Sequence, residues 1–231
     1  MRNILPIIVA IATLMSSCRP DPKTITVEVR TTYNGSPIIS GETYYKGDTA
    51  IKFDLFHFYL SNLAVGQDSI ILGDAMFINA DDSASHFYEL NLKDHQGGVH
   101  IGIGLDSLQN SADPTAFPTT HPLSSANAMY WSWATKYRFF KIDGRTNASG
   151  AFGVDDNLLA WHTGLDELYR TANFNADVNP GDHLIFELRV EELIRGISLA
   201  TETVTHTTVD DVDIAIKLSD NAVEALVLRV E

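Results

Sequence analysis

Apolar and polar residues alternate along most of this chain, which is the pattern of β-strands with one buried face. The alternation is clean over residues 24–30, and a longer apolar-rich stretch covers 51–65, which we interpret as one long strand or two. Residues 33–36 supply a turn after the first strand. Short strands at this spacing favour an all-β fold, a single-domain antiparallel β-sandwich. Further strands are predicted at 70–72, 87–90, 99–103, 137–144, 184–190, 213–218 and 225–230.

Helical periodicity is scarce, and only two short helices are predicted, at 155–161 and 165–171. Residues 106–129 form a stretch rich in Ser, Asn, Pro and Thr that shows no period. It is much longer than an ordinary connection between strands, and loops of this length are usually functional or disordered. We therefore expect a sandwich with long functional loops and few short helices, in which this loop and the segment around His162 meet near one end.

The start of the chain predicts an exported lipoprotein. A short basic leader precedes an apolar run over 4–14, which is too short to cross a bilayer as a permanent helix and is typical of a signal peptide. Ser16 and Ser17 then precede Cys18, as small residues do at the cleavage site of bacterial lipoproteins. We expect residues 1–17 to be the signal peptide, Cys18 to carry the lipid, 18–23 to be a tether, and 24–231 to form the domain.

The net charge and the cysteine content exclude some classes of ligand and some chemistry for the mature protein. The formal net charge is −14, which repels nucleic acid and argues against it as a ligand. Cys18 is the only cysteine, so the folded domain has neither a disulfide nor a reactive thiol. The expected partner is a membrane, reached through several acyl groups on Cys18, with the domain facing the periplasm or the cell surface.

The chain lacks the common catalytic signatures: G-x-S-x-G, H-E-x-x-H, the P-loop, and G-x-G-x-x-G at the start of a helix. Its acidic pairs lie in predicted turns and do not follow the spacing of a calcium loop. We therefore predict a protein that is not an enzyme. The less favoured alternative is a small hydrolase that uses Asp106 or Asp113 with His121 or His162.

Histidine is the residue type in this chain that is best suited to bind a transition metal. Without a thiolate, a transition-metal site has to use imidazole, carboxylate or an unusual ligand. His121 ends the long loop and His162 lies between the two predicted short helices, so both could face one pocket. His57 lies within the apolar stretch 53–63 and is a third candidate. Three others, in polar and turn-like surroundings, are expected at the surface: His95, His183 and His206.

Several segments, taken in order, carry a resemblance to a known family. Residues 101–107 (Ile-Gly-Ile-Gly-Leu-Asp-Ser) precede the paired tryptophans Trp131 and Trp133, and a strand-like segment at 136–144 follows. Upstream lies Phe-Tyr-Leu-Ser-Asn-Leu at 58–63, and His-Thr-Gly lies downstream at 162–164. From about residue 24 to the C-terminus, the chain resembles the MbnP-like proteins, periplasmic copper-binding proteins first associated with methanobactin operons. The paired-tryptophan segment is the most specific part of the resemblance.

The resemblance implies an unusual metal site. In characterised members a di-haem peroxidase partner oxidises a tryptophan to kynurenine, which binds copper together with histidines. Carried over, Trp131 or Trp133 is the modified residue and His162 is the matching histidine. The chain departs from the family at Ser111, which stands in place of a histidine, and His121 or His57 could substitute for it. The alternative function is a module that binds another ligand or a protein and keeps the fold without the metal.

Overall fold

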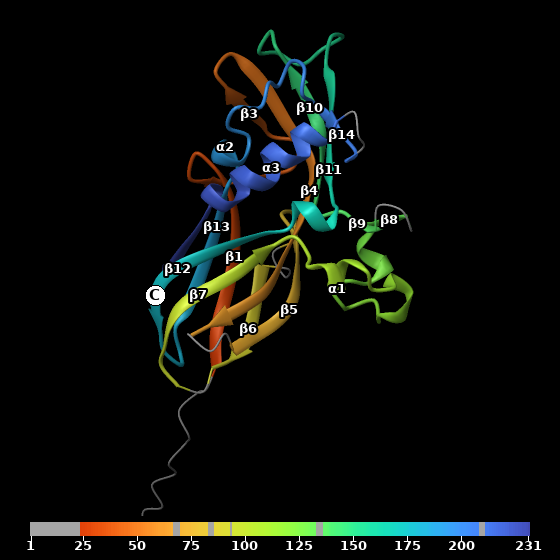
Figure 1. The fold of residues 1–231 in the computed structure, drawn as a ribbon. Helices are drawn as coiled ribbons and strands as arrows, with labels where there is room; N and C mark the ends of the chain where they lie inside the picture. Colours follow the sequence, from red (N-terminus) through yellow and green to blue (C-terminus); the bar gives the residue numbers. More distant parts are fainter. Residues whose placement is uncertain (1–23, 67–69, 83–85, 93, 133–135, 208–210) are drawn as a thin grey trace, which may run out of the picture.

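The computed structural model describes residues 24–66, 70–82, 86–92, 94–132, 136–207 and 211–231 (Figure 1). Four features predicted from the sequence lie outside these residues: the signal peptide 1–17, the lipidation residue Cys18, the tether 18–23, and Trp133. Among the described helices, none has both the length and the apolar composition needed to cross a membrane.

The predicted β-sandwich is confirmed, and its strands form two large sheets. The first sheet has the order β15-β13-β1-β2, with β6 also paired to β1. Its strands are β1 (Thr24–Tyr33), β2 (Ser36–Pro37), β6 (Phe87–Asn91), β13 (His183–Arg189) and β15 (Leu226–Val230). Most pairings are antiparallel, as expected, but β1 pairs with β13 in the parallel sense.

The second sheet has the order β12-β7-β4-β10-β11-β14, and β3 and β5 also pair with β4. Here β11 and β14 are parallel. The strands are β3 (Thr43–Lys46), β4 (Thr49–Val65), β5 (Ile70–Asn79), β7 (Gln96–Ile103), β10 (Phe140–Asn147), β11 (Asn157–Thr163), β12 (Arg170–Val178) and β14 (Val204–Thr205). A small separate hairpin is formed by β8 (Tyr130–Ser132) and β9 (Lys136–Tyr137).

The long strand β4 forms the centre of the second sheet. It pairs with β3, β5, β7 and β10, and most of its side chains are buried, including those of Phe53, Phe56 and Phe58. Phe58 stacks on Phe140 of β10 with ring centres 5.7 Å apart. Gly144 lies at a bulge between β10 and β4, where an added Cβ would lie 2.0 Å from the carbonyl oxygen of Lys52. The close pairing of β4 and β10 therefore requires glycine at this position.

Three sequence predictions of local structure are wrong. Residues 213–218, predicted as a strand, belong to the helix α3 (Val212–Ala225), which buries Ala215, Leu218 and Ala222 on one face. Residues 155–161, predicted as a helix, enter β11, which pairs with β10 along its whole length. The helix predicted at 165–171 is a single turn, η4 (Asp166–Leu168), followed by β12.

The long loop 106–129 contains three short helical turns and no strand among its residues. They are α1 (Ser107–Asn110), η2 (Pro114–Ala116) and η3 (Ser125–Asn127), and another short helix, α2 (Val190–Leu193), follows β13. In Figure 1 the loop, with β8 and β9, lies beside the sandwich. Asn110 donates a hydrogen bond to Asp166, so the loop meets the residues just after β11, as predicted.

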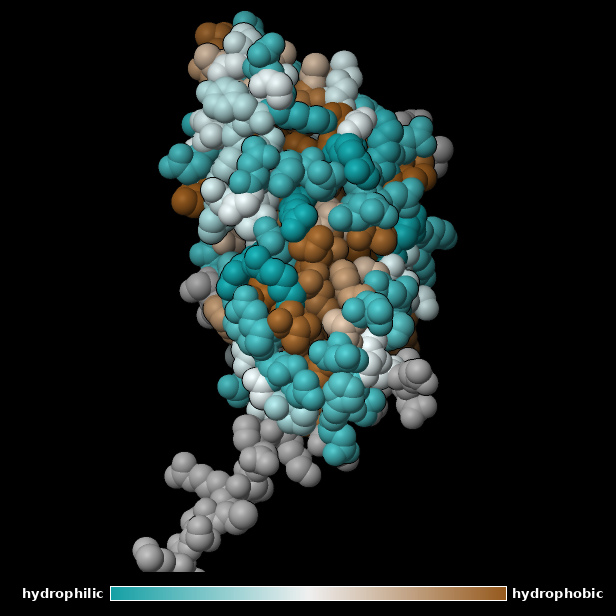
Figure 2. Space-filling model, turned by 90° about the vertical axis from the view of Figure 1, so that its left-hand side faces the viewer, coloured by the Kyte–Doolittle hydropathy of each residue, from teal (hydrophilic) through white to brown (hydrophobic). Residues whose placement is uncertain are grey.

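Figure 2 shows the face on the left of Figure 1, where hydrophilic side chains cover most of the surface around a band of apolar ones. Such a band is ordinary for a soluble domain, because polar groups cannot cover a whole protein surface. The large apolar side chains are mainly inside: Trp161, Tyr59, Phe53, Phe56, Phe58 and Phe186 are all almost fully buried.

Candidate metal-binding site

The strand register places four basic side chains in one row on one face of the second sheet. His57 in β4 is opposite Lys141 in β10, and Lys141 is opposite His162 in β11. The parallel pairing of β14 with β11 then brings His206, just after β14, beside His162. Residues opposite each other in neighbouring strands point to the same face. Two histidines that are 44 positions apart in sequence therefore become neighbours.

Trp131 packs against both of these histidines. The ring centres of His162 and His206 are 5.1 Å apart, and the Trp131 ring lies 5.5 Å from the first and 4.9 Å from the second. We call these three side chains the Trp–His cluster. Trp131 belongs to β8 and is 42% exposed, so one part of its indole remains accessible to solvent. The Arg138 guanidinium lies 4.1 Å from the centre of the Trp131 ring, within cation–π range, and helps to hold the indole in place.

Each histidine of the cluster has one nitrogen that no described residue pairs with. The Nδ1 atoms of His162 and His206 are buried and have no hydrogen-bond partner among the described residues. Buried polar atoms are nearly always paired, so each exception requires an explanation. Two such nitrogens in adjoining rings form a donor pair suited to a metal ion, because neutral imidazole is a common ligand of copper and zinc.

An acidic residue contacts the other nitrogen of His162. Asp143 in β10 lies diagonally across from His162, and its Oδ1 is 2.6 Å from Nε2 of His162. Burial raises the pKa of Asp143, but the hydrogen bond from His162 and the positive charges of Lys141 and Arg138 outweigh burial and hold that pKa below its usual value. Asp143 is therefore an ionised carboxylate at neutral pH.

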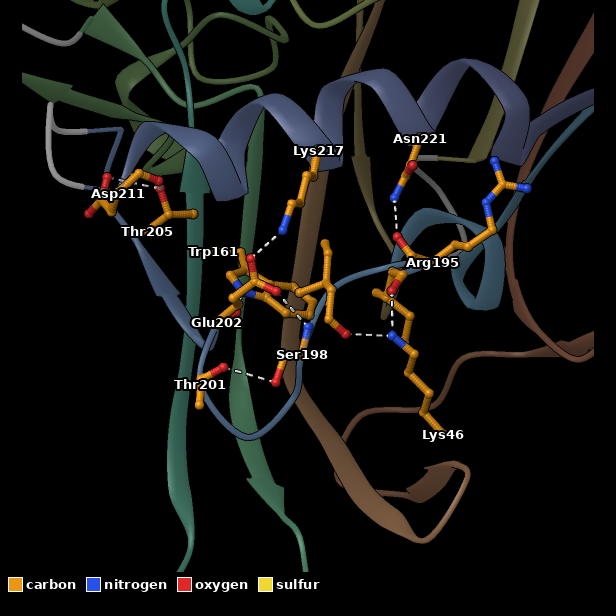
Figure 3. Close-up of polar contacts among 12 residues, drawn as sticks. Lys46, Trp161, Arg195, Ser198, Thr201, Glu202, Thr205, Asp211, Lys217 and Asn221 are labelled. Atoms are coloured by element: carbon orange, nitrogen blue, oxygen red, sulfur yellow. Dashed lines mark hydrogen bonds and ion pairs between the residues drawn. The ribbon is translucent and has the colours of Figure 1, made fainter.

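The segment that carries His206 is fixed by contacts with β11 and α3 (Figure 3). The indole nitrogen of Trp161 donates to the carbonyl oxygen of Glu202 at 2.9 Å, and the Glu202 carboxylate pairs with Lys217 of α3. Thr205 donates to the carbonyl oxygen of Asp211 at 3.0 Å. The position of His206 beside His162 is thus set by the core and not by a free loop.

The backbone around His162 is also closely packed. Gly164 lies so close to β9 that an added Cβ would be 2.1 Å from the carbonyl oxygen of Tyr137. The hydroxyl of Thr207 donates to the carbonyl oxygen of His162 at 2.8 Å. The His-Thr-Gly sequence therefore combines a side chain in the cluster with a glycine that allows β9, next to Trp131, to approach.

His121, a predicted ligand, lies elsewhere in the long loop. Its ring stacks on Phe117 with centres 4.1 Å apart, and its Nδ1 accepts a hydrogen bond from the backbone N–H of Leu123. Within the described part of the chain, no ring contact joins His121 to the Trp–His cluster. The structure brings His162 together with His206 instead.

His57 and Ser111 are also outside the cluster. His57 packs edge-on against Phe77, and Lys141 separates it from His162 in the row. Burial and the neighbouring charge of Lys141 lower the pKa of His57 despite opposing effects of Asn79, Asp81 and Asp143. Ser111 ends α1, donates to the carbonyl oxygen of Ser107 and accepts from Lys136.

His206 is the residue that the sequence analysis missed. It was expected at the surface, but its ring packs against Trp131 and His162 with a buried nitrogen. The only local signal is the two-residue strand before it, and that strand is too short to be recognised from its pattern. The pairing that matters joins β14 to β11, about 40 residues upstream in the chain.

The cluster is not a conventional site with three protein ligands. Among the residues that the structure describes, no group of three or more His, Cys, Asp or Glu side chains is placed to hold a metal ion. The cluster offers two imidazoles and an indole, and an unmodified indole N–H is a donor that cannot coordinate a metal. A third ligand from this cluster would have to be a chemically changed Trp131.

The fold and the cluster together define a β-sandwich with two histidines on one face of its larger sheet and a tryptophan of a separate hairpin packed against them. The MbnP family model matches residues 22–210, and the chain therefore belongs to the MbnP family. The solved structure of MbnP from Methylosinus trichosporium shares its fold, with a TM-score of 0.61 and 12% sequence identity. That similarity covers 91% of this chain and 99% of the other. No curated protein matches this chain.

Proposed function

We propose that this protein binds a copper ion at the Trp–His cluster through Nδ1 of His162 and Nδ1 of His206. The observation that carries the proposal is the pair of buried nitrogens that lack a hydrogen-bond partner among the described residues. The ring spacing supports it. Because a metal–imidazole bond is about 2.0–2.1 Å long, two rings that bind one ion have centres about 5–6 Å apart. The observed separation is 5.1 Å.

We further propose that oxidation of Trp131 to kynurenine completes the site, through a di-haem peroxidase partner of the kind that the family resemblance implies. Trp131 contacts both histidines and is exposed enough for another protein to reach it. Oxidation by peroxide that cleaves the C2–C3 bond of the indole and releases C2 as formate would give an aromatic amine and a carbonyl, groups that can coordinate a metal where the indole cannot. Trp133, the other candidate, lies outside the described residues.

The oxidation of Trp131 is tested by the mass of the protein purified from its native host. Conversion of tryptophan to kynurenine exchanges one carbon atom for one oxygen atom. We expect this change in the peptide that contains Trp131, and we expect it to be absent from a Trp131→Phe variant. An unmodified Trp131 peptide, or a change confined to Trp133, would remove Trp131 as a ligand.

Copper binding is tested by titration with Cu(I) in competition with a chelator in reducing buffer. We expect one copper per chain. We expect His162→Ala and His206→Ala each to weaken binding by about 100-fold or more, because loss of a metal ligand reduces affinity more than loss of a residue that only hydrogen-bonds to a ligand. Binding should also weaken in acid, because a protonated imidazole cannot coordinate a metal ion.

Two variants serve as controls for this titration. His95→Ala removes a histidine whose side chain is 57% exposed, and His121→Ala removes the predicted ligand that stacks on Phe117. Both are expected to bind copper like the wild type. If His121→Ala loses affinity while His206→Ala does not, copper binds in the long loop. If no variant differs from the wild type, the Trp–His cluster is not the site, and the alternative of a metal-free binding module is favoured.

The protein is proposed to act at a membrane surface, as a lipoprotein anchored through Cys18 and facing the periplasm or the cell exterior. The support is the sequence of the first 23 residues, which combines a basic leader, an apolar run and small residues before the cysteine. We propose a role in binding or carrying copper and no catalytic activity of its own.

A further inference from the structure

We propose that Asp143 is a positioning residue that fixes the tautomer of His162, so that the ring presents Nδ1 to the metal. This inference rests on the proposed copper site, and it assigns a role to a residue that contacts one of the proposed ligands. Its geometric basis is the contact of 2.6 Å between Asp143 Oδ1 and His162 Nε2, the nitrogen on the opposite side of the ring from the unpaired Nδ1.

The choice of tautomer follows from the chemistry of the two groups. An ionised carboxylate can only accept hydrogen bonds, so the His162 nitrogen that faces it must carry the hydrogen. A neutral imidazole has one N–H, and the lone pair is then left on Nδ1. The opposite tautomer would place two acceptors against each other at 2.6 Å and would bury an N–H at Nδ1 without an acceptor among the described residues. Both effects disfavour it.

The sheet holds Asp143 in the position that this role requires. Asp143 and Lys141 lie on the same face of β10, with Lys141 directly opposite His162 and Asp143 opposite Ala160. The small side chain of Ala160 leaves room for the carboxylate to reach diagonally to the imidazole. The side chain of His162 is 11% exposed, so water has little access to compete for its Nε2. Carboxylates behind metal-bound histidines commonly orient the ring in this way.

The critical variant is Asp143→Asn, which keeps the shape of the side chain but adds an amide that can donate to Nε2. We expect nitrogen NMR of the copper-free wild type to show His162 with its hydrogen on Nε2. In Asp143→Asn we expect a mixture or the opposite tautomer, together with Cu(I) affinity lower by about 10–100-fold, the usual effect of removing such a group. Lys141→Gln is the matched control, because it removes a charge from the same row without contacting Nε2.

The outcomes separate the two proposals. If the wild type binds copper but Asp143→Asn keeps both the tautomer and the affinity, the role of Asp143 is refuted and the copper site stands. If Lys141→Gln changes affinity as much as Asp143→Asn, the effect is one of charge and not of orientation, which also refutes the role. If the wild type binds no copper, the proposed function itself fails. A tautomer change and affinity loss confined to Asp143→Asn would support both.

Discussion

Replacement of Cys18 by alanine is expected to release the protein from membranes almost completely. Each buried methylene of an acyl chain contributes about 0.8 kcal/mol to membrane binding, so several chains on one cysteine outweigh any single side-chain contact. The protein surface adds little attraction of its own, since a net charge of −14 is repelled by anionic lipids. We expect the wild type to sediment with membranes and the Cys18→Ala variant to carry no lipid and to appear in the soluble fraction.

The measurement is fractionation of cells after a high-salt wash, combined with metabolic labelling by a fatty acid. Ser16→Ala is the matched control, because it changes the cleavage region but keeps both a small residue and the cysteine. It is expected to behave like the wild type. If Cys18→Ala still incorporates label or remains with the washed membranes as a processed protein, the lipoprotein prediction is wrong.

Replacement of Trp161 by alanine is expected to lower the free energy of unfolding by about 3–5 kcal/mol, the usual cost of deleting a buried large aromatic side chain. Trp161 is fully buried, and its indole nitrogen donates to the carbonyl oxygen of Glu202. The variant therefore leaves both a cavity and an unpaired carbonyl. Trp161 also precedes His162 and is paired with Thr205, so its loss should loosen the contact between β11 and the segment that carries His206.

Chemical denaturation followed by circular dichroism gives this free energy directly. Leu158→Ala is the control on the same strand, because that side chain is 65% exposed, and its replacement should change the free energy of unfolding by no more than about 0.5 kcal/mol. Equal losses in the two variants would contradict the burial that the structure assigns to Trp161. A loss of copper affinity in Trp161→Ala without unfolding would support its role in placing the two histidines.

The sequence was sufficient where a residue's neighbours in the chain decide its structure. The apolar-rich stretch over residues 51–65 predicted β4, and the clean alternation over residues 24–30 predicted β1, because alternate side chains of a half-buried strand face the core. Shorter apolar segments predicted β7, β13 and β15. The order of the Trp131 and His162 segments indicated the family, which the comparisons confirmed.

The sequence pattern gave the wrong secondary structure where it was compatible with both a helix and a strand. Residues 212–225 contain apolar positions that fit a short strand, but Ala215, Leu218 and Ala222 also lie on one helical face, and burial of that face favours the helix. Residues 155–161 were predicted as a short helix, yet pairing with β10 satisfies the backbone of β11, and Trp161 is buried there. In both segments tertiary packing overrode local preference.

The sequence by itself determined the fold class, the family and the tryptophan and histidine segments from which a site could be built. Only the tertiary structure decided which histidines meet, because the parallel pairing of β11 with β14 joins segments about 40 residues apart and has no local signature. That pairing brings His206 to His162, while local stacking keeps His121 on Phe117. The same register places Asp143 against His162, a contact that depends on which strands lie side by side and not on any motif.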